Sequence, residues 1–583
     1  DGATGTFANI TLKGVGTAQA LLTVNSGGTV TIGSNLGITD GGQIALDGGA
    51  NPINLNATPP SGMSYQLLTS YQNATDEGRA IVNAGSVSSP LQYFTLIAPA
   101  STASIAYELD LDGTTIRLYE RPVVGIYLDP LNGNDAYSGA KSSRPVKTLA
   151  RAKAIWSNRN TAIPGIVTDI YVLRRITLTE NTTLDGGIRL TRFAGDTDLA
   201  TTMTDSLIIY SGQELIINDA TINNGSISGS ALHAYMGKLT LNNGATIMSN
   251  NNYDIIRSYN TSGTVTMNAG STITSTGTSG YSIYSYNATE VRINGGTITT
   301  SGNGIYKYYG TMIINDLNMT HTVGSVCIQN NYGTTTINNC TITTRGTGAF
   351  INNYGTFTLN NGYIKNERTT NGYTMGSSNG TMVINGGTID AGQAAAVYNT
   401  SSSGITLNKA DISSTNTTYG AVYSTYTIRL NGEDVKITGG SIYMATVTLE
   451  SRYIQIISPT VTQDYTLKII SGAPYTALVR SSPSIDLGLY ESKFTLEPIN
   501  GYLLAAYANK GEGPKNIVLY NPNGIYVNDF IGVDANTGES PASPVKTLAN
   551  AATKTSATKT LIYICDSTLT INSPQDISQP AVK

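Results

Sequence analysis

The stretch that decides the fold is LTLNNGATI at residues 239–247, because it returns with small changes along the chain. Apolar and polar residues alternate up to an asparagine, and a small residue follows before the next short alternating run. The period-2 alternation predicts β-strands, and the Asn-Gly pair predicts a tight corner. Further copies read VTMNAGSTI (265–273), VRINGGTIT (291–299), TTINNCTIT (335–343), FTLNNGYIK (357–365) and MVINGGTID (382–390).

The corner asparagine recurs at intervals of 21 to 26 residues. Strands this short cannot bury an apolar face alone, whereas stacked turns bury a continuous core, so the repeat predicts an all-β parallel β-solenoid. Asparagine tolerates the left-handed backbone of a corner, and its amide can bond the asparagine above and below. We therefore predict a structural ladder of Asn218, Asn242, Asn268, Asn294, Asn315, Asn338, Asn360, Asn385, Asn408 and Asn431.

A longer repeat encloses the short one. Residues 125–152 and 524–551 are identical at 14 of 28 positions at an offset of 399, which indicates modules of about 400 residues. We expect the chain to be a fragment of a longer tandem array. The predicted divisions are the C-terminal part of one module (1–61), a β-rich junction (62–122), a complete β-helix with an N-terminal cap (123–460), a second junction (461–522) and the start of the next module (523–583).

The composition excludes several classes of protein. Only 12% of the residues are charged, about half the usual share, and the net charge is −4, so a nucleic-acid partner is not expected. No stretch approaches 18 apolar residues, so no membrane span is predicted. Two histidines and three cysteines disfavour a histidine-rich metal centre and a disulfide framework, and we predict no cofactor and no bound metal.

The turns resemble the right-handed parallel β-helix of pectate-lyase-like proteins, as used in microbial surface adhesins. The stretch IYLDPLNGNDAYSGAKSSRPVKTLARA (126–152) is similar to the entry segment of such helices. The resemblance implies a helix over 146–156 that caps the open end of the core. Val146, Leu149, Ala152 and Trp156 do fall on one helical face, and Pro145 suits a first turn.

Acidic residues are candidates for catalysis or for calcium binding. Asp219 and Asp316 share the position after the corner asparagine, but they lie four turns apart, about 19 Å, which is too far for paired acid–base work. We therefore predict no catalytic residues, and a polysaccharide-degrading enzyme is the least favoured alternative. Oxygen ligands for Ca²⁺ gather at Asp129, Asn132, Asn134 and Asp135, but the simpler interpretation is that Asp135 and its counterpart Asp534 cap turns.

Five tyrosines recur near one corner at about the period of the turns, namely Tyr259, Tyr286, Tyr309, Tyr332 and Tyr354. An exposed row of rings could stack on sugar rings, with Asn260, Asn287, Asn331 and Asn353 as hydrogen-bonding neighbours. Stacking of the rings on one another, which only stabilises the solenoid, is the favoured alternative.

Together these features predict an extracellular structural or adhesive repeat protein at the cell surface. Tandem modules would form a stiff stalk or fibre, with low charge and few thiols suited to that setting. The expected partners are neighbouring modules and further copies of the chain in fibres. A carbohydrate-binding module that uses the tyrosine row, with a glycan ligand, is the second hypothesis.

Overall fold

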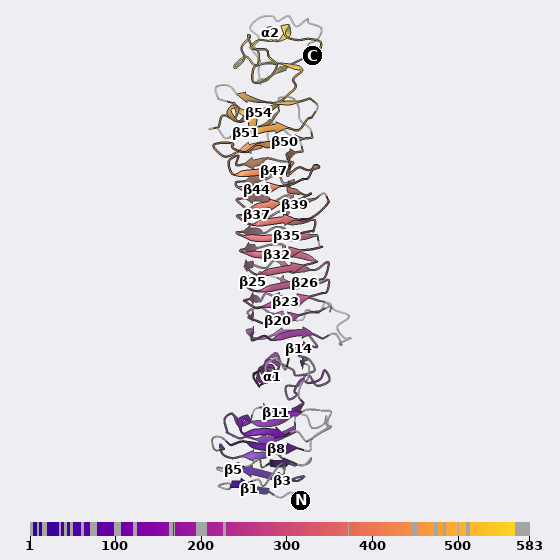
Figure 1. Cartoon of the computed structure of the whole chain (residues 1–583), viewed down its shortest axis with the longest axis vertical. Coiled ribbons are helices and arrows are strands. Elements are labelled where there is room, and N and C mark those ends of the chain that lie inside the picture. Colours follow the sequence, from indigo (N-terminus) through magenta and orange to yellow (C-terminus); the bar gives the residue numbers. More distant parts are fainter. Residues whose placement is uncertain are drawn as a thin grey trace. The chain divides into compact units, whose positions relative to one another are not determined.

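The structure is a computed structural model in which short β-strands stack in successive turns of a solenoid (Figure 1). It describes residues 4–7, 11–13, 20–33, 37–39, 43–46, 50–59, 63–69, 79–97, 107–112, 114–120, 125–162, 167, 169–193, 207–225, 229–259, 261–323, 325–370, 372–445, 452–470, 476–481, 485–499, 501–508 and 514–565.

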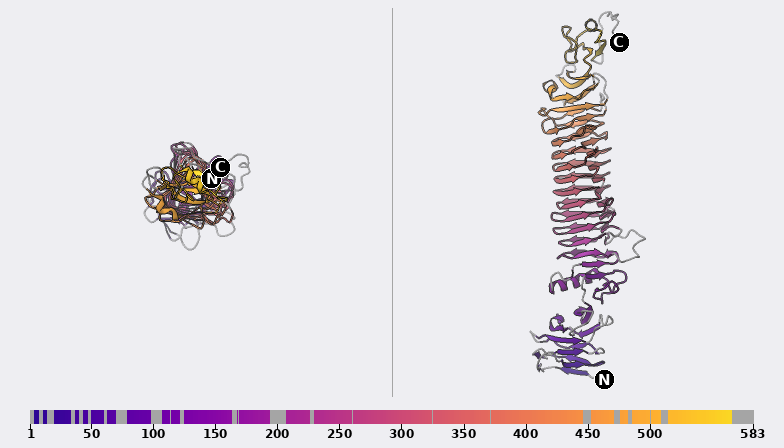
Figure 2. Two further views of the ribbon diagram at one scale, coloured as in Figure 1. Left: turned by 90° about the horizontal axis from the view of Figure 1, so that it is seen from above. Right: turned by 45° about the vertical axis from the view of Figure 1, so that its right-hand side comes forward.

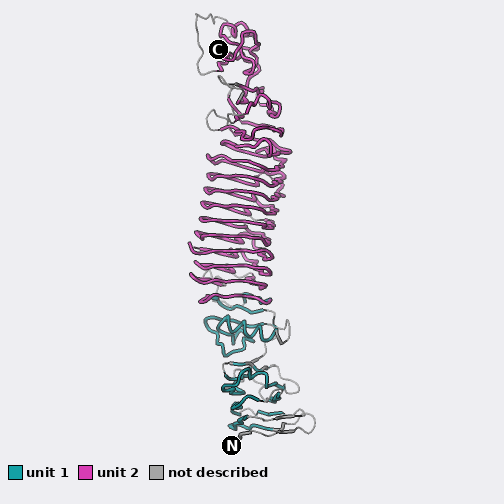
Figure 3. Tube along the Cα trace, turned by 90° about the vertical axis from the view of Figure 1, so that its left-hand side faces the viewer, with its two compact units in different colours: residues 1–176, 187–206 teal, residues 177–186, 207–583 magenta. Residues whose placement is uncertain are grey.

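The predicted solenoid is confirmed. Strands make up 49% of the chain and helices 6%, and the parallel sheets stack as a β-solenoid of about 16 turns. Two compact units are distinguished in Figure 3: residues 1–176 with 187–206, and residues 177–186 with 207–583. No helix within the described ranges is both long and apolar enough to cross a membrane.

In the second unit each turn contributes one strand to each of three sheets, and the turns lie one above another (Figure 2). We name the sheets after their side chains. The ladder sheet, whose strands mostly end at the ladder asparagines, contains β16 (Thr182–Leu184), β19 (Glu214–Ile217), β22 (Lys238–Leu241), β25 (Thr264–Asn268), β28 (Glu290–Asn294), β31 (Thr311–Ile314), β34 (Thr334–Ile337), β37 (Thr356–Leu359), β40 (Thr381–Ile384), β43 (Ile405–Leu407), β46 (Ile428–Leu430), β49 (Ile454–Ile456), β51 (Ala477–Ser481), β54 (Pro514–Tyr520) and β53 (Leu503–Ala508).

The threonine sheet follows the ladder sheet along the chain. In the second unit it contains β20 (Thr221–Asn223), β23 (Thr246–Ser249), β26 (Thr272–Ser275), β29 (Thr297–Thr300), β32 (Leu317–His321), β35 (Cys340–Thr344), β38 (Tyr363–Asn366), β41 (Thr388–Asp390), β44 (Ala410–Ser413) and β47 (Val435–Thr438). Its name refers to the outward Thr-x-Thr pairs, such as Thr272 with Thr274 and Thr297 with Thr299, which the register aligns.

The tyrosine sheet completes each turn. In the second unit it contains β18 (Leu207–Ile209), β21 (Leu232–Tyr235), β24 (Ile256–Tyr259), β27 (Tyr281–Tyr286), β30 (Asn303–Lys307), β33 (Val326–Asn330), β36 (Gly348–Asn352), β39 (Tyr373–Ser377), β42 (Ala395–Asn399), β45 (Val422–Ser424), β48 (Ile442–Met444), β50 (Tyr465–Ile469) and β52 (Phe494–Leu496). Strand β15 (Ile176–Leu178) lies at the boundary between the units.

Parallel register aligns equivalent residues of successive turns into apolar columns. Ile273, for example, pairs with Ile247 on one side and with Ile298 on the other, and all three are fully buried. Because alternate strand residues face inward, every turn contributes apolar side chains from all three sheets to one core. This packing explains why most strands need only three to five residues, built around one apolar-x-apolar triplet.

The first unit contains the remaining sheets. A six-stranded sheet runs in the order β1-β4-β7-β9-β12-β11, a four-stranded sheet in the order β10-β8-β6-β3, and β2 pairs with β5. Strands β13 and β14 pair with each other in parallel, and β14 pairs with β17. The bounds are β1 (Thr4–Phe7), β2 (Thr11–Lys13), β3 (Ala20–Val24), β4 (Thr29–Ile32), β5 (Gly37–Thr39), β6 (Gln43–Leu46), β7 (Ile53–Leu55), β8 (Tyr65–Thr69), β9 (Arg79–Asn83), β10 (Phe94–Ile97), β11 (Tyr107–Asp112), β12 (Thr115–Glu120), β13 (Gly125–Leu128), β14 (Asp169–Val172) and β17 (Arg189–Arg192).

The end of a module is built twice in the chain, once in each unit. In the first unit β8 pairs in parallel with β10, β9 pairs antiparallel with β12, and β12 forms a hairpin with β11. In the second unit β50, β52, β51, β54 and β53 repeat the same pairings. A ring contact recurs as well, because the ring centroids of Tyr65 and Phe94 lie 5.4 Å apart and those of Tyr465 and Phe494 lie 5.9 Å apart.

The division of the chain into five predicted domains stays a prediction.

The entry segments also match, but the first helix starts later than predicted. Helix α1 runs from Leu149 to Ala162, whereas the sequence predicted a helix over 146–156. Val146 instead pairs with Leu128 as an isolated bridge. The reason is Asp135, whose carboxylate accepts the amides of Lys147 and Thr148 at 2.8 Å and so fixes these residues ahead of the helix. In the second copy, α2 (Leu548–Thr553) follows Thr547 as its N-cap.

One buried hydroxyl in the core has no partner, and this gives a test of the column packing. Thr335 lies between Met312 and Phe357 in an inward column of the ladder sheet, and no hydrogen bond to its Oγ1 is present among the described residues. We expect Thr335→Val to raise the free energy of unfolding by about 1 kcal/mol, because valine keeps the shape and removes the unsatisfied group. Thermal unfolding measures this, with Thr336→Val on the outer face as the control. A lower midpoint for Thr335→Val than for the control would contradict the packing.

Candidate functional site

The predicted asparagines line one corner, between the ladder sheet and the threonine sheet, and join in a row of hydrogen bonds. From Asn242 to Asn408, the Nδ2 of each ladder asparagine donates to the Oδ1 of the ladder asparagine in the preceding turn, over 2.7 to 3.2 Å, and Asn218 accepts the first of these bonds. Asn431 differs, because its Oδ1 accepts the amides of Glu433 and Asp434 and its Nδ2 donates to the Asp434 carboxylate. Nine of the ten residues therefore form one continuous ladder, and Asn431 acts as a local turn cap.

The two acidic residues that share a position after this corner are turn residues. Asp219 and Asp316 have φ values of 33° and 51°, in the left-handed region. Asp316 also accepts the Asn339 amide at 2.8 Å. These two turns lack the glycine that six of the ten ladder corners place one or two residues after the asparagine, and in both of them an aspartate takes the left-handed conformation.

A second polar column lies inside the corner that joins the tyrosine sheet to the ladder sheet. Register aligns its members, which are Ser285, Lys307, Asn330, Asn352, Ser377, Asn399 and Ser424, and all are buried. Asn330 and Asn352 each donate to the carbonyl of a glycine three residues later, at 2.9 Å. Ser377 does the same to Gly380 at 3.1 Å. The column thus satisfies backbone carbonyls that turn into the core at this corner.

This column was not predicted, although the sequence contains its signal. The spacing polar-x-x-Gly recurs at Lys307–Gly310, Asn330–Gly333, Asn352–Gly355 and Ser377–Gly380. The polar residue varies between lysine, asparagine and serine, so the pattern is less regular than the row of ladder asparagines. What the members share is a donor at hydrogen-bond distance from a corner carbonyl.

Lys307 is the unusual member, because a fully buried cation takes the place of a neutral donor. Its Nζ donates to the Ala288 carbonyl at 2.6 Å and to Ser285 Oγ at 3.1 Å. Burial lowers the pKa of Lys307 to about 8, against a smaller opposing effect of Glu290. At neutral pH the ammonium is the main form, and the two acceptors offset part of the cost of its burial.

The third corner, between the threonine and tyrosine sheets, also has buried polar residues on its inner side. Thr300, His321, Thr344 and Asn366 are aligned by the register. His321 Nδ1 lies 2.8 Å from Thr344 Oγ1, which accepts the Gly346 amide at 2.9 Å. Burial lowers the pKa of His321 and raises that of Cys327 beside Thr344 to about 12. All three cysteines are free thiols and buried.

The five predicted tyrosines lie on the outside of the tyrosine sheet, but in two adjacent columns. Tyr259 pairs with Tyr286, and the Tyr286 ring stacks on Tyr308 with centroids 4.8 Å apart. Tyr309, Tyr332 and Tyr354 lie one position further along, with centroids 5.2 and 4.8 Å apart. Counting residues per turn does not reveal the change of column. Tyr308 and Tyr309 are adjacent, and both lie about one turn after Tyr286.

The rings of the second column cover one another's faces. Both neighbours of Tyr332 stack on it, at interplanar angles of 23° and 6°, so both of its faces are occupied. The exposed fraction of Tyr332, 44%, therefore belongs mainly to its ring edge and hydroxyl, whereas Tyr309 and Tyr354, exposed by 44% and 55%, each have one stacked neighbour. A sugar stacks on a ring face, so sugar binding by this row stays a prediction and mutual stacking accounts for the geometry.

Neighbouring polar groups continue the first column. Asn331 donates to the Tyr306 hydroxyl at 2.7 Å, and Asn353 donates to Asn331. Burial raises the pKa of Tyr306 to about 12. Asn287 has a φ of 59°, a corner conformation, and Asn260 lies outside the described residues.

A further stack lies nearer the end of the solenoid. Tyr398 stacks on Tyr423 at 4.6 Å and on Tyr373 at 5.4 Å. Gly376 makes room for this arrangement, because a Cβ there would lie 2.8 Å from the Tyr373 ring. The tyrosine sheet therefore has stacked rings over most of its outer face.

The loop considered for calcium has other partners. Asp129 accepts the amides of Leu131 and Asn132 and pairs with Arg174 Nε at 3.2 Å. Asp135 and Asp534 cap the turn before each helix, as the simpler interpretation predicted. Among the described residues no group of three or more histidine, cysteine or acidic side chains is arranged to hold a metal ion.

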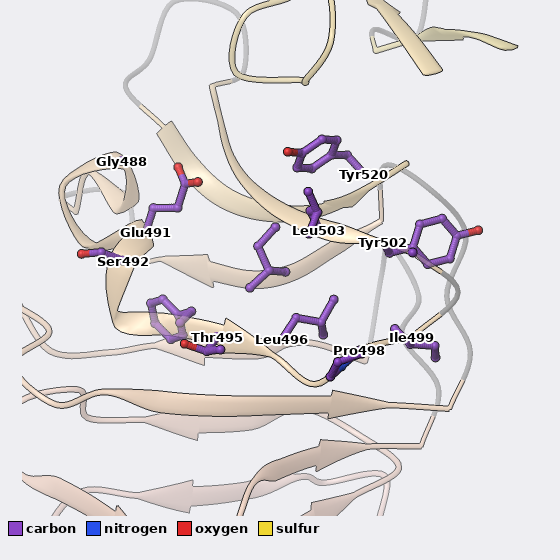
Figure 4. Close-up of a pocket in the computed structure, with 13 residues that line it drawn as sticks. Gly488, Glu491, Ser492, Thr495, Leu496, Pro498, Ile499, Tyr502, Leu503 and Tyr520 are labelled. Carbon is purple, nitrogen blue, oxygen red and sulfur yellow. The ribbon is translucent and has the colours of Figure 1, made fainter. Parts of the chain in front are cut away.

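A groove of about 740 Å³ lies at the end of the second unit, between β52 and the hairpin β53–β54 (Figure 4). Glu491, from the 3₁₀ helix η4 (Leu487–Lys493), accepts the Ala506 amide at 3.0 Å. Strand β53 is the last strand of its sheet, so this carboxylate occupies an outward N–H of an edge strand and opposes edge-to-edge pairing.

Comparison with protein-family models, with curated proteins and with solved structures finds no match to this chain. The site is therefore defined by its geometry alone: three corners with polar columns and an outer face of stacked tyrosines.

The ladder gives a direct mutational test. Asn338 donates to Asn315 and accepts from Asn360, both at 2.7 Å, whereas Asn339 donates only to Asp316. We expect Asn338→Ala to lower the free energy of unfolding by about 1–3 kcal/mol, because two hydrogen bonds are lost and the row is interrupted. Asn339→Ala is the matched control, with a smaller loss. Equal losses in chemical denaturation would show that the ladder contributes nothing beyond a surface turn.

Lys307 predicts a specific dependence of stability on pH. The pKa of Lys307 in the folded chain is about 8, below the ordinary value of 10.5, so between these pH values the unfolded chain binds a proton that the folded chain does not. The stability of the folded chain therefore rises with pH across this window, by about 3 kcal/mol at most. From pH 8 to pH 10 we expect the free energy of unfolding of the native chain to rise relative to that of Lys307→Met. A difference independent of pH would contradict the buried ammonium.

Proposed function

We propose that the chain is a structural segment of an extracellular repeat protein, in which tandem β-solenoid modules form a stiff spacer at the cell surface. The observation that carries the proposal is the duplicated module end. The strands that end a module and the entry segment that begins the next one each occur twice, about 400 residues apart, with the same strand pairings. A chain that repeats both an end and a beginning is suited to head-to-tail extension, because repeat stability depends on neighbouring units.

The construction of the module supports a mechanical role. Parallel ladders run through 10 to 13 strands of each sheet in the second unit, and the corners add side-chain hydrogen bonds along the same direction. Load applied along the solenoid is therefore shared by three sheets and by the polar columns. The resemblance to pectate-lyase-like surface adhesins agrees with this proposal, and self-association into fibres would extend it.

A spacer has to be rigid over many turns, and this can be measured in the full chain. Thr266 and Thr406 face outward in the same column of the ladder sheet, six turns apart. Spin labels on Thr266→Cys and Thr406→Cys should give one narrow distance of about 29 Å, from a rise of about 4.8 Å per turn. The three native cysteines are buried and do not compete for the label.

The same distance should be found at low and at high salt, because few charges lie between the labels. A broad distribution would contradict a stiff spacer. Separately, antibodies against the chain should label intact cells of the source organism, and labelling only after permeabilisation would contradict the extracellular setting.

A further inference from the structure

A groove on the corner between the threonine and tyrosine sheets lies outside the features used so far. It has a volume of about 640 Å³ and is lined by Val323, Arg345, Thr347, Glu367, Arg368 and the threonines at 369 and 370. Such a volume lies within the range of small-ligand sites, about 300–1,000 Å³. All of these residues belong to the second unit, on three consecutive turns.

The groove exists because one loop is longer than the loop beside it. Six residues separate β38 from β39, whereas only three, 345 to 347, separate β35 from β36 in the preceding turn. The buried Asn366 fixes the start of the longer loop, because its Oδ1 accepts the Arg368 amide at 3.0 Å. The shorter loop is fixed by Thr344 through the Gly346 amide. The corner column therefore determines where both arginines leave the solenoid.

Both guanidinium groups are held through Nε. Arg345 Nε lies 3.0 Å from Glu367 Oε2, and Arg368 Nε donates to Thr370 Oγ1 at 2.6 Å. No hydrogen bond joins the Nη atoms of either arginine to another described residue, and the Arg345 side chain is 65% exposed. Each guanidinium thus keeps its terminal N–H groups for a ligand while its orientation is fixed.

The charge of this corner is positive in a chain that is negative overall. Glu367 accepts from Lys365 at 2.9 Å as well as from Arg345, and these partners lower its pKa. Asp390 lies beside Lys365 on the next strand. The corner therefore has two carboxylates and three cations, which are Arg345, Lys365 and Arg368, so its net charge is +1. Arg368 pairs with a hydroxyl rather than with a carboxylate.

We propose that this groove binds an acidic saccharide, a sugar chain that carries carboxylate or sulfate groups. Arginine recognises such planar or tetrahedral anions with two N–H groups at once. Threonine hydroxyls at 347, 369 and 370 suit the hydroxyls of a sugar ring, and Val323, exposed by 62%, offers an apolar surface to its C–H groups. The spacer would then have an adhesive site on its side, independent of the tyrosine row.

The test is isothermal titration of the full chain with a hyaluronan tetrasaccharide, which carries glucuronate. Chitotetraose is the neutral comparison, and sodium sulfate is the free anion. We expect saturable binding of the acidic tetrasaccharide that weakens at least tenfold in Arg368→Gln and decreases with ionic strength. Binding of chitotetraose with equal affinity, or of sulfate alone, would overturn the proposal.

Two further variants exclude indirect effects. Glu367→Gln removes the negative charge from the groove, so it should retain or tighten binding, whereas Arg429→Gln, on the outer face of the ladder sheet, should leave it unchanged. Loss of binding in Arg429→Gln, or unchanged binding in Arg368→Gln, would overturn the proposal. Circular dichroism checks that each variant folds. The spin-label distance tests the stiff spacer separately, so failure of saccharide binding and failure of the spacer are distinguishable.

Discussion

The structure depends on how its corners satisfy backbone polar groups. Each turn bends three times, and every bend directs N–H and C=O groups away from the regular strand pattern, where leaving them unpaired would cost free energy. The solenoid places polar side chains at each corner, repeated from turn to turn, and at two of the three corners these side chains bond backbone groups. The ladder asparagines bond one another, and the inner columns at the other two corners bond backbone groups or neighbouring side chains. The inward columns of the strands can then be mainly apolar, with Thr335 as an exception.

The sequence predicted the regular part of this arrangement. Asn242 and its equivalents stand out because one residue type serves one geometry in every turn, and the apolar-x-apolar strands follow directly from their alternation. The start of α1 was predicted three residues early, because the bonds from Asp135 to Lys147 and Thr148 join residues that are distant in the sequence. The column that contains Lys307 was not predicted, since lysine, serine and asparagine replace one another there.

The tyrosines show a second limit of counting residues per turn. Tyr308 and Tyr309 are neighbours, and only the strand register decides which of them stacks on Tyr286. That one-residue step separates the single predicted row into two columns, and in the second column both faces of the Tyr332 ring are covered. The groove beside Arg345 and Arg368 was not foreseen either, because it arises from a difference in loop length between two turns rather than from a motif. Irregular turns, not the repeat itself, are therefore where this solenoid is most suited to acquire a binding function.

Hydrogen–deuterium exchange of the full chain tests the role of the corners most directly. The corner amides of Asn331 and Thr334 donate to carbonyls of the preceding turn at 2.9 and 3.0 Å, as the amide of Thr356 does in the next turn. If the polar columns hold the corners in place, residues 330–334 and 352–356 exchange as slowly as strands β33 and β36. Exchange at these corners near the rate of an unfolded chain, with the strands still protected, would contradict the account.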